Sequence, residues 1–233
     1  MGWDTPAFWL GLLEVIWVNI LLSGDNAVVI ALAARSLPES RQVPTIALGA
    51  GAAVVLRVIL TLVAAELLLL PWLKFVGGLL LLYIGISLLL PEKDGGGPVR
   101  EQNGMLAAIR TIIIADLVMS LDNVVAVAAA AHGSLVLLVL GLAISIPLVV
   151  FGSTLLLKVT ERFPFIVWVG GALIGYIAGE MLVSDPGVHE WVTRLLTASN
   201  VSQEGLIVAA GGLGALTVLV TGKLMGRGAE SSC

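Results

Sequence analysis

The chain has little charge for its length. Of its 233 residues, 12% are charged and 58% are hydrophobic, and its mean hydropathy is +1.06. Soluble domains are about 25% charged and 45–50% apolar. This composition excludes an ordinary soluble domain and indicates an integral membrane protein.

Cysteine and histidine are almost absent. The one cysteine, Cys233, excludes an intrachain disulfide, and the two histidines, His132 and His189, fall in expected loops. A thiolate or imidazole metal site inside the membrane is therefore excluded. No basic segment precedes the first apolar run, so we expect no cleavable signal peptide. There is also no basic stretch suited to nucleic acid and no ATP-binding motif.

Long apolar segments are what the chain does contain. A membrane-spanning helix needs about 20 mostly apolar residues, and seven segments qualify. We therefore predict an all-α polytopic membrane protein with seven transmembrane helices, at about 8–34, 44–70, 72–90, 105–131, 134–157, 164–184 and 204–222.

The basic residues predict the orientation. Most of the 12 lysines and arginines fall in alternate loops, which the positive-inside rule places in the cytoplasm. The N-terminus is then outside and the C-terminus is cytoplasmic. The residues that set this orientation are Arg35, Arg41, Lys93, Arg100, Arg110, Lys158, Arg162, Lys223 and Arg227.

One short motif occurs twice inside apolar segments, as Ser23-Gly24-Asp25-Asn26 and as Ser120-Leu121-Asp122-Asn123. A charge at bilayer depth costs about 2.5–3.5 kcal/mol on insertion scales, so such carboxylates are usually functional. The linker divides the first six expected helices into three and three, so the second copy enters the membrane from the opposite side. This predicts an inverted repeat, which is an architecture of secondary transporters. The predicted parts are the first repeat 1–90, a cytoplasmic linker 91–104, the second repeat 105–184, an outer loop 185–203, and a seventh helix with a cytoplasmic tail 204–233.

Helical geometry constrains how the two motifs face each other. At 100° per residue, Asp116, Ser120 and Asn123 form one polar stripe, and Asn19, Ser23 and Asn26 form the matching stripe of the first copy. Asp122 lies about 120° from Asp116, so one straight helix cannot aim both at one point. We therefore predict either breaks near Gly24 and Leu121 or different roles for the two carboxylates.

The polar residues of the two motifs offer only oxygen ligands. Carboxylates of Asp25 and Asp122, amides of Asn26 and Asn123, and the serine hydroxyls suit Mn²⁺, Mg²⁺ or Ca²⁺. Two carboxylates balance one divalent charge and disfavour an anionic substrate. The alternative is that these residues only hydrogen bond helices to one another.

Other intramembrane polar residues are candidates for coupling or gating. Asp116, where the first copy has Asn19, is a third ligand or a proton carrier. Glu180 is a second candidate for proton coupling. Glu14 either lines an outer vestibule or reaches the interface. Arg57 pairs with an acid, as a structural ion pair or as a gate. Gly171, Gly175 and Gly179 pack helices closely, either within the bundle or in a homodimer.

The segments Leu22-Ser23-Gly24-Asp25-Asn26-Ala27 and Ala115-Asp116-Leu117-Val118-Met119-Ser120-Leu121-Asp122-Asn123 resemble the TerC family of integral membrane proteins, and within it the YjbE-type branch. The resemblance implies Mn²⁺ efflux, and the family name refers to tellurite resistance. It also implies that Asp25, Asn26, Asp122 and Asn123 are metal ligands, with Asp116 close by.

These observations favour an exporter of Mn²⁺ or another divalent cation in the bacterial inner membrane, exchanging it for protons and carrying no prosthetic group. One alternative is a metal-binding scaffold that metalates partner proteins, and another is an exporter of an organic cation. An intramembrane aspartyl protease is disfavoured, because Asp25 and Asp122 lack the Gly-x-Gly-Asp and Tyr-Asp contexts. We therefore expect no enzymatic activity.

Overall fold

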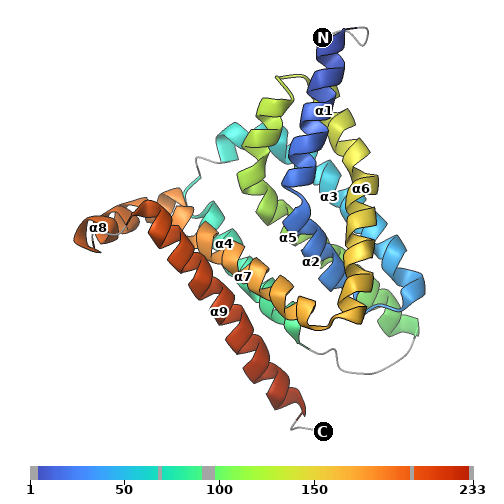
Figure 1. Ribbon diagram of the computed structural model, residues 1–233, viewed down its shortest axis with the longest axis vertical. Coiled ribbons are helices and arrows are strands. Elements are labelled where there is room, and N and C mark those ends of the chain that lie inside the picture. Colours follow the sequence, from blue (N-terminus) through green and yellow to red (C-terminus); the bar gives the residue numbers. More distant parts are fainter. Residues whose placement is uncertain (1–4, 68–69, 91–97, 200–201, 231–233) are drawn as a thin grey trace. The chain divides into compact units, whose positions relative to one another are not determined.

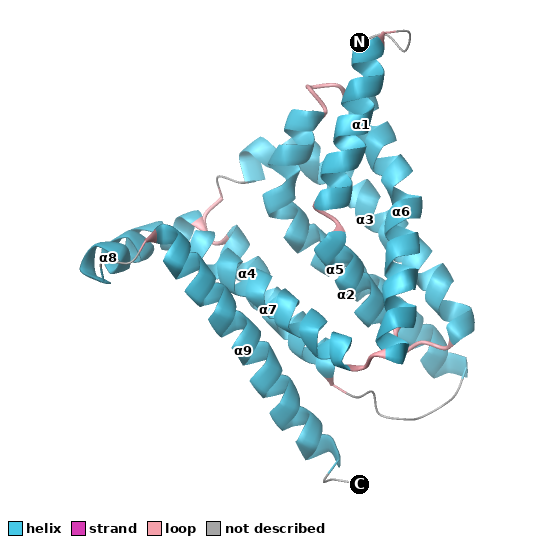
Figure 2. Ribbon diagram, in the orientation of Figure 1, coloured by secondary structure: helices cyan, strands magenta, loops and turns pink. Residues whose placement is uncertain are grey.

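A computed structural model describes residues 5–67, 70–90, 98–199 and 202–230, and over these ranges the chain is helical without a strand (Figures 1 and 2). The all-α prediction is therefore confirmed for this part of the chain. The elements are α1 (Pro6–Leu21), α2 (Gly24–Ala34), α3 (Glu39–Leu67), α4 (Leu73–Leu89), α5 (Pro98–Ala130), α6 (Leu135–Arg162), α7 (Phe165–Ser184), the 3₁₀ turn η1 (Pro186–Val188), α8 (His189–Ser199) and α9 (Gln203–Glu230).

Five or six membrane spans follow from helix length and composition. Within the described ranges, α3, α5, α6, α7 and α9 each hold a long apolar stretch, and α1 with α2 forms a sixth if that bent pair is one span. Helix α4, the expected span 72–90, has only 17 residues. At 1.5 Å per residue it covers about 26 Å, less than the roughly 30 Å of a bilayer core. The count of seven spans stays a prediction.

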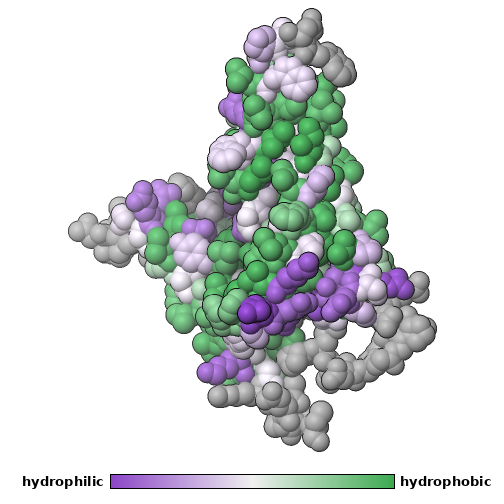
Figure 3. Space-filling view, turned by 45° about the vertical axis from the view of Figure 1, so that its right-hand side comes forward, coloured by the Kyte–Doolittle hydropathy of each residue, from purple (hydrophilic) through white to green (hydrophobic). Residues whose placement is uncertain are grey.

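The surface of the helices matches a lipid environment. Large apolar side chains are exposed on several helices, including Leu13 and Trp17 on α1 and Phe151 and Leu155 on α6. Figure 3 shows apolar residues over much of the visible helical surface. In water such a surface would be an aggregation liability, whereas lipid tails solvate it.

The helices form two compact units. The first comprises Met1–Ala65 with Gly95–Val159, and the second comprises Glu66–Asp94 with Thr160–Cys233. Each unit thus draws helices from both expected halves, 1–90 and 105–184. The third helix of each half, α4 and α7, lies in the second unit, and the two pack against each other there. The inverted repeat itself stays a prediction.

Small residues set the packing of the first unit. Val15 of α1 is buried with Val127 of α5 and Leu142 of α6 in one apolar cluster. Helix α6 approaches α1 at Gly141, where any side chain would collide with Val15. On α3, a Cβ at Gly49 would lie 2.9 Å from Ile112 Cδ1 of α5. Close backbone approach in a lipid-exposed bundle depends on such small residues.

The glycines of α7 have the same use in the second unit. Gly171 packs on Leu89 of α4, and a Cβ at Gly175 would lie 2.6 Å from the carbonyl oxygen of Gly214 on α9. Gly179 meets the backbone of α9 at Ala210. Of the two uses expected for this stripe, the structure shows close packing within the bundle, and a homodimer stays a prediction.

Two segments expected as loops contain helix. Helix α8 lies within the expected outer loop 185–203, and α5 begins at Pro98, inside the expected linker 91–104. Helix α8 mixes apolar with polar residues along its sequence, and Arg194 Nη2 lies 3.7 Å from Glu190 Oε2 one turn away. A short amphipathic helix contains no apolar segment long enough to span a membrane, so a search for such segments does not detect it.

Asp185 connects the end of α7 to the start of α4. Its Oδ1 accepts a hydrogen bond from the Trp72 backbone N–H at 2.8 Å, and its Oδ2 accepts one from Phe75 at 3.1 Å. Trp72 has φ 71°, a left-handed conformation that is rare for a bulky residue. A carboxylate beside the first N–H groups of a helix is stabilised by the helix dipole. Asp185 thus caps α4 through contacts distant in sequence.

Candidate functional site

The first motif copy lies at a break between two helices. Helix α1 ends at Leu21, α2 begins at Gly24, and the two axes differ by 53°. Gly24 is a poor helix former, which favours the break expected there. In the second copy, α5 runs without interruption from Pro98 to Ala130. The break expected near Leu121 is therefore absent, because leucine favours the continuous helix.

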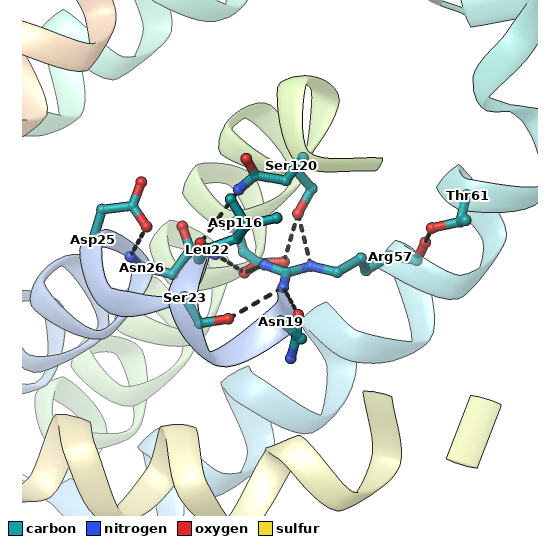
Figure 4. Close-up of polar contacts among 10 residues, drawn as sticks. Asn19, Leu22, Ser23, Asp25, Asn26, Arg57, Thr61, Asp116 and Ser120 are labelled. Atoms are coloured by element: carbon teal, nitrogen blue, oxygen red, sulfur yellow. Dashed lines mark hydrogen bonds and ion pairs between the residues drawn. The ribbon is translucent and has the colours of Figure 1, made fainter. Parts of the chain in front are cut away.

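Six buried polar side chains meet at this break, and we call them the Arg57 cluster (Figure 4). They come from α1, the break, α2, α3 and α5, and each is at most 6% exposed. The members are Asn19, Ser23, Asn26, Arg57, Asp116 and Ser120.

The guanidinium of Arg57 is the centre of the cluster. It forms an ion pair with Asp116 of α5. Its Nη1 donates to Asn19 Oδ1 at 2.7 Å and to Ser23 Oγ at 3.4 Å, and its Nε donates to Ser120 Oγ at 2.9 Å. One cation thus contacts oxygens from both motif copies.

Asp116 accepts from the first motif as well. Its Oδ1 accepts from Asn26 Nδ2 at 2.9 Å, and its Oδ2 accepts from Ser120 Oγ at 3.3 Å. Arg57 is 4% exposed and Asp116 is 6% exposed. Buried charges are tolerated when they are paired and hydrogen bonded. The cluster is therefore neutral with one positive and one negative charge.

Two amide atoms in the cluster have no protein hydrogen-bond partner. These buried atoms are Asn26 Oδ1 and Asn19 Nδ2. An unsatisfied buried polar atom costs about 1–3 kcal/mol. Such atoms need an explanation, and a site for a small polar ligand is one.

A small cavity adjoins these amides. Its volume is about 10 Å³, and its polar lining is Asn19, Ser23, Asn26, Arg57 and Asp116. This is roughly the space that one water molecule needs. The remaining lining is apolar and comprises Ile30, Ala50, Ala53, Val54 and Val149.

A larger open groove of about 160 Å³ lies beside the break, between α1–α2 and α6. It shares Ser23 and Val149 with the inner cavity. Its other lining residues include Gly24 and Gly152, which have no bulk to obstruct it. Ser23 and Val149 therefore line both the groove and the inner cavity.

The structure brings together part of the expected metal site. Four of its residues, Asn26, Asp116, Ser23 and Ser120, belong to the Arg57 cluster. At its edge, half-buried Asp25 accepts a hydrogen bond from the Asn26 backbone N–H at 2.9 Å. Half-buried Asn123 donates to the freed Leu22 carbonyl at 3.3 Å.

Asp122 lies outside the cluster. It is exposed on α5, because an unbroken helix turns it about 120° from Asp116. This corresponds to the second of the two arrangements that the helical geometry allowed, in which the carboxylates face different directions. Among the described residues, no three acidic, histidine or cysteine side chains group together to hold a metal ion.

The remaining candidates are distributed over the molecule. Asn19 and Arg57 are in the cluster. Arg57 was expected to pair with an acid, and in the structure this acid is Asp116. Glu14 Oε2 lies 3.1 Å from His132 Nε2, with both side chains about half exposed. Glu180 is on α7 in the second unit, with its side chain hydrogen bonded to Tyr176. The central place of Arg57 is what the sequence did not reveal, although it is the one basic residue deep in a span.

Residues 4–225 match the integral membrane protein TerC family. The chain belongs to the TerC family. The match includes both motif copies and every residue of the Arg57 cluster. Membership in this family supports a role in membrane transport or a related process.

Three similar proteins come from Bacillus subtilis (strain 168), all described as uncharacterized membrane proteins. The uncharacterized membrane protein YjbE is 44% identical over 176 residues, which is 76% of this chain and 80% of YjbE. YkoY is 26% identical, over 79% of this chain and 68% of its own length. YceF is 25% identical, over 76% of this chain and 72% of its own length. No solved structure matches the chain.

Proposed function

We propose that this TerC-family protein is a secondary exporter of a divalent cation, foremost Mn²⁺, in the bacterial inner membrane. The observation that carries the proposal is the Arg57 cluster. It is a buried set of oxygen ligands at a helix break, where Ser23 and Asn26 of the first motif meet Ser120 of the second motif and Asp116, one turn before it. Irregular backbone within a span is tolerated where it lines a cavity, and transporters place ion sites there.

The donor chemistry supports a hard cation. Asp116 supplies a carboxylate, the two serines supply hydroxyls, and Asn26 Oδ1 is an acceptor with no protein partner. Asp25, at the edge of the cluster, supplies a second carboxylate. Oxygen ligands of this kind suit Mn²⁺, Mg²⁺ and Ca²⁺. The preference for manganese rests on the resemblance to the family.

The dimensions of the site disfavour an organic cation. The cavity of about 10 Å³ has room for a water-sized ligand and not for an amine with a carbon skeleton. The groove beside it is lined mainly by apolar residues and adjoins the cluster at Ser23. A scaffold that metalates partner proteins shares this chemistry but moves no ion across the bilayer.

The energy source follows from the protein's own groups. Asp116 is the buried carboxylate that a proton can neutralise, so we propose proton exchange at this residue. We also propose that the N-terminus lies outside and the C-terminus in the cytoplasm. As an exporter, the protein takes up its ion from the cytoplasmic side.

Flux into proteoliposomes tests the proposal. Purified protein is reconstituted with a lumenal metal indicator and a lumenal pH dye, and Mn²⁺, Mg²⁺ and Ca²⁺ are added separately. We expect saturable Mn²⁺ flux with an opposing proton movement. Metal binding without flux would favour the scaffold, and flux of organic amines instead of metals would favour the organic-cation exporter.

A further inference from the structure

We propose that Arg57 is the resident cation of the transport site. In the empty carrier its guanidinium occupies the position that the metal ion takes, and it leaves Asp116 when the metal binds. This inference rests on the proposed function and assigns a specific role to the one basic residue of the cluster.

The contacts of the guanidinium support competition. Its four partners are Asp116, Asn19, Ser23 and Ser120, and every contacting partner atom is an oxygen. Apart from the amide of Asn26 and the edge carboxylate of Asp25, these are the oxygens available to a metal ion in the cluster. A guanidinium has five donors and accepts none, so it uses the same lone pairs that a metal ion needs. The two cations cannot be coordinated by these oxygens together.

Charge balance leads to the same conclusion. With Arg57 in place, a divalent ion would raise the positive charge at the site to three against the two carboxylates Asp116 and Asp25, which leaves one charge uncompensated in a buried space. With Arg57 withdrawn, Asp116 and Asp25 together balance one divalent ion. Buried charge without compensation is strongly unfavourable, so metal binding and displacement of Arg57 are linked.

A purely structural ion pair predicts different behaviour. If Arg57 only ties α1, α3 and α5 together, its removal weakens the fold and with it the metal site. If Arg57 competes with the metal, its removal strengthens metal binding at equilibrium. The sign of the change in affinity separates the two roles.

Titration of Mn²⁺ followed by electron paramagnetic resonance tests this, since the spectrum of the hydrated ion is lost on binding. The full chain is compared in lipid nanodiscs as wild type, Arg57→Gln and Arg57→Lys, with exposed Arg110→Gln as the matched control. We expect Arg57→Gln to bind on the order of tenfold more tightly, a usual size for coupled equilibria. The Mn²⁺ affinity of Arg57→Lys should lie between those of the wild type and Arg57→Gln, because an ammonium lacks the planar set of donors with which a guanidinium holds these oxygens. Arg110→Gln should match wild type.

A second measurement uses free guanidinium as the probe. In Arg57→Ala, added guanidinium chloride at concentrations too low to unfold the protein should weaken Mn²⁺ binding competitively. It should have no such effect on wild type, where the site holds its own guanidinium. A structural role for Arg57 gives no competition in either protein.

The outcomes separate the two proposals. If the wild type binds Mn²⁺ and neither Arg57→Gln nor Arg57→Lys binds it more tightly, the resident-cation role alone is overturned. Absence of Mn²⁺ binding in every variant overturns both this role and the proposed function. Should Arg57→Gln fail to fold, the Mn²⁺ affinity of Arg57→Lys still decides the question.

Discussion

Arg57 of α3 and Asp116 of α5, which are 59 residues apart in sequence, form a buried ion pair that joins the two helices. The pair is surrounded by amides and hydroxyls from both motif copies (Figure 4). It makes the centre of this lipid-exposed bundle polar, and it does so without net charge.

The first prediction concerns the stability of this pair. Asp116→Asn and Arg57→Gln should each lower the free energy of unfolding by roughly 3–5 kcal/mol, because each leaves a buried charge unpaired. The double variant should lose less than the sum of the two. SDS-induced unfolding of the purified protein measures this double-mutant cycle. Additive losses would show that the two residues do not interact.

Asn26 is predicted to serve metal binding through its amide. Asn26→Leu removes both the donor to Asp116 and the spare acceptor Oδ1. Mn²⁺ affinity should fall by roughly tenfold or more, since a hydrogen bond to a charged group is worth about 1.5–3 kcal/mol. Val28→Leu, a half-buried site on the same helix, is the control and should bind normally. Unchanged affinity of Asn26→Leu would remove Asn26 from the site.

Two glycine variants in the second unit test whether close helix packing limits the size of side chains there. Gly175→Ala places a Cβ about 2.6 Å from the Gly214 carbonyl oxygen, whereas Gly212→Ala on α9 meets nothing within 4 Å. The first should lower the unfolding free energy by about 1–3 kcal/mol through overpacking. The second should raise it slightly, because alanine favours the helix. Thermal unfolding of both proteins in the same detergent measures the contrast.

Asp185 predicts a dependence of stability on pH. Burial raises the pKa of this carboxyl, but hydrogen bonds from the backbone N–H groups of Trp72, Phe75, Gly187 and Lys74 outweigh it and hold the pKa below its usual value. An unfolded aspartate has a pKa of about 3.9. The stabilisation is therefore present above that pH and is lost as the pH falls through the lower folded pKa.

The variant Asp185→Asn checks this prediction. Its unfolding free energy should lie below that of wild type by a constant amount above about pH 5, where the carboxyl of Asp185 is ionised in both states. The difference in unfolding free energy between wild type and Asp185→Asn should become smaller below about pH 4. A gap that widens as the pH falls would reverse the sign predicted for Asp185.

Much of the site was predictable from helical periodicity. Asp116 and Ser120 lie four residues apart and Asn19, Ser23 and Asn26 repeat the stripe, so their shared faces follow from 3.6 residues per turn. The structure places all five in one cluster. The same geometry left Asp122 on another face, and the unbroken α5 keeps it there.

The place of Arg57 was not predictable in this way. Its position in a span indicated an acidic partner, but which face of α3 meets α5 depends on tertiary packing. Close contacts such as Gly49 with Ile112 set that packing, and no local pattern specifies the pair.

The grouping of helices was not predictable from the chain either. Sequence order suggested two consecutive halves, whereas α4 and α7 pack together with α9 in one compact unit. Nor did hydropathy reveal α8, since that helix is short and amphipathic. Membership in the TerC family and the all-helical fold, by contrast, followed from the motifs and the composition.

Comparison of Asp116→Asn with Asp122→Asn in proteoliposomes tests the central claim most directly. Both variants remove one carboxylate from α5, but only Asp116 belongs to the Arg57 cluster. The proposed site predicts Mn²⁺ flux at background level for Asp116→Asn and flux close to wild type for Asp122→Asn. Undiminished flux in folded Asp116→Asn, or loss of flux in Asp122→Asn alone, would contradict it.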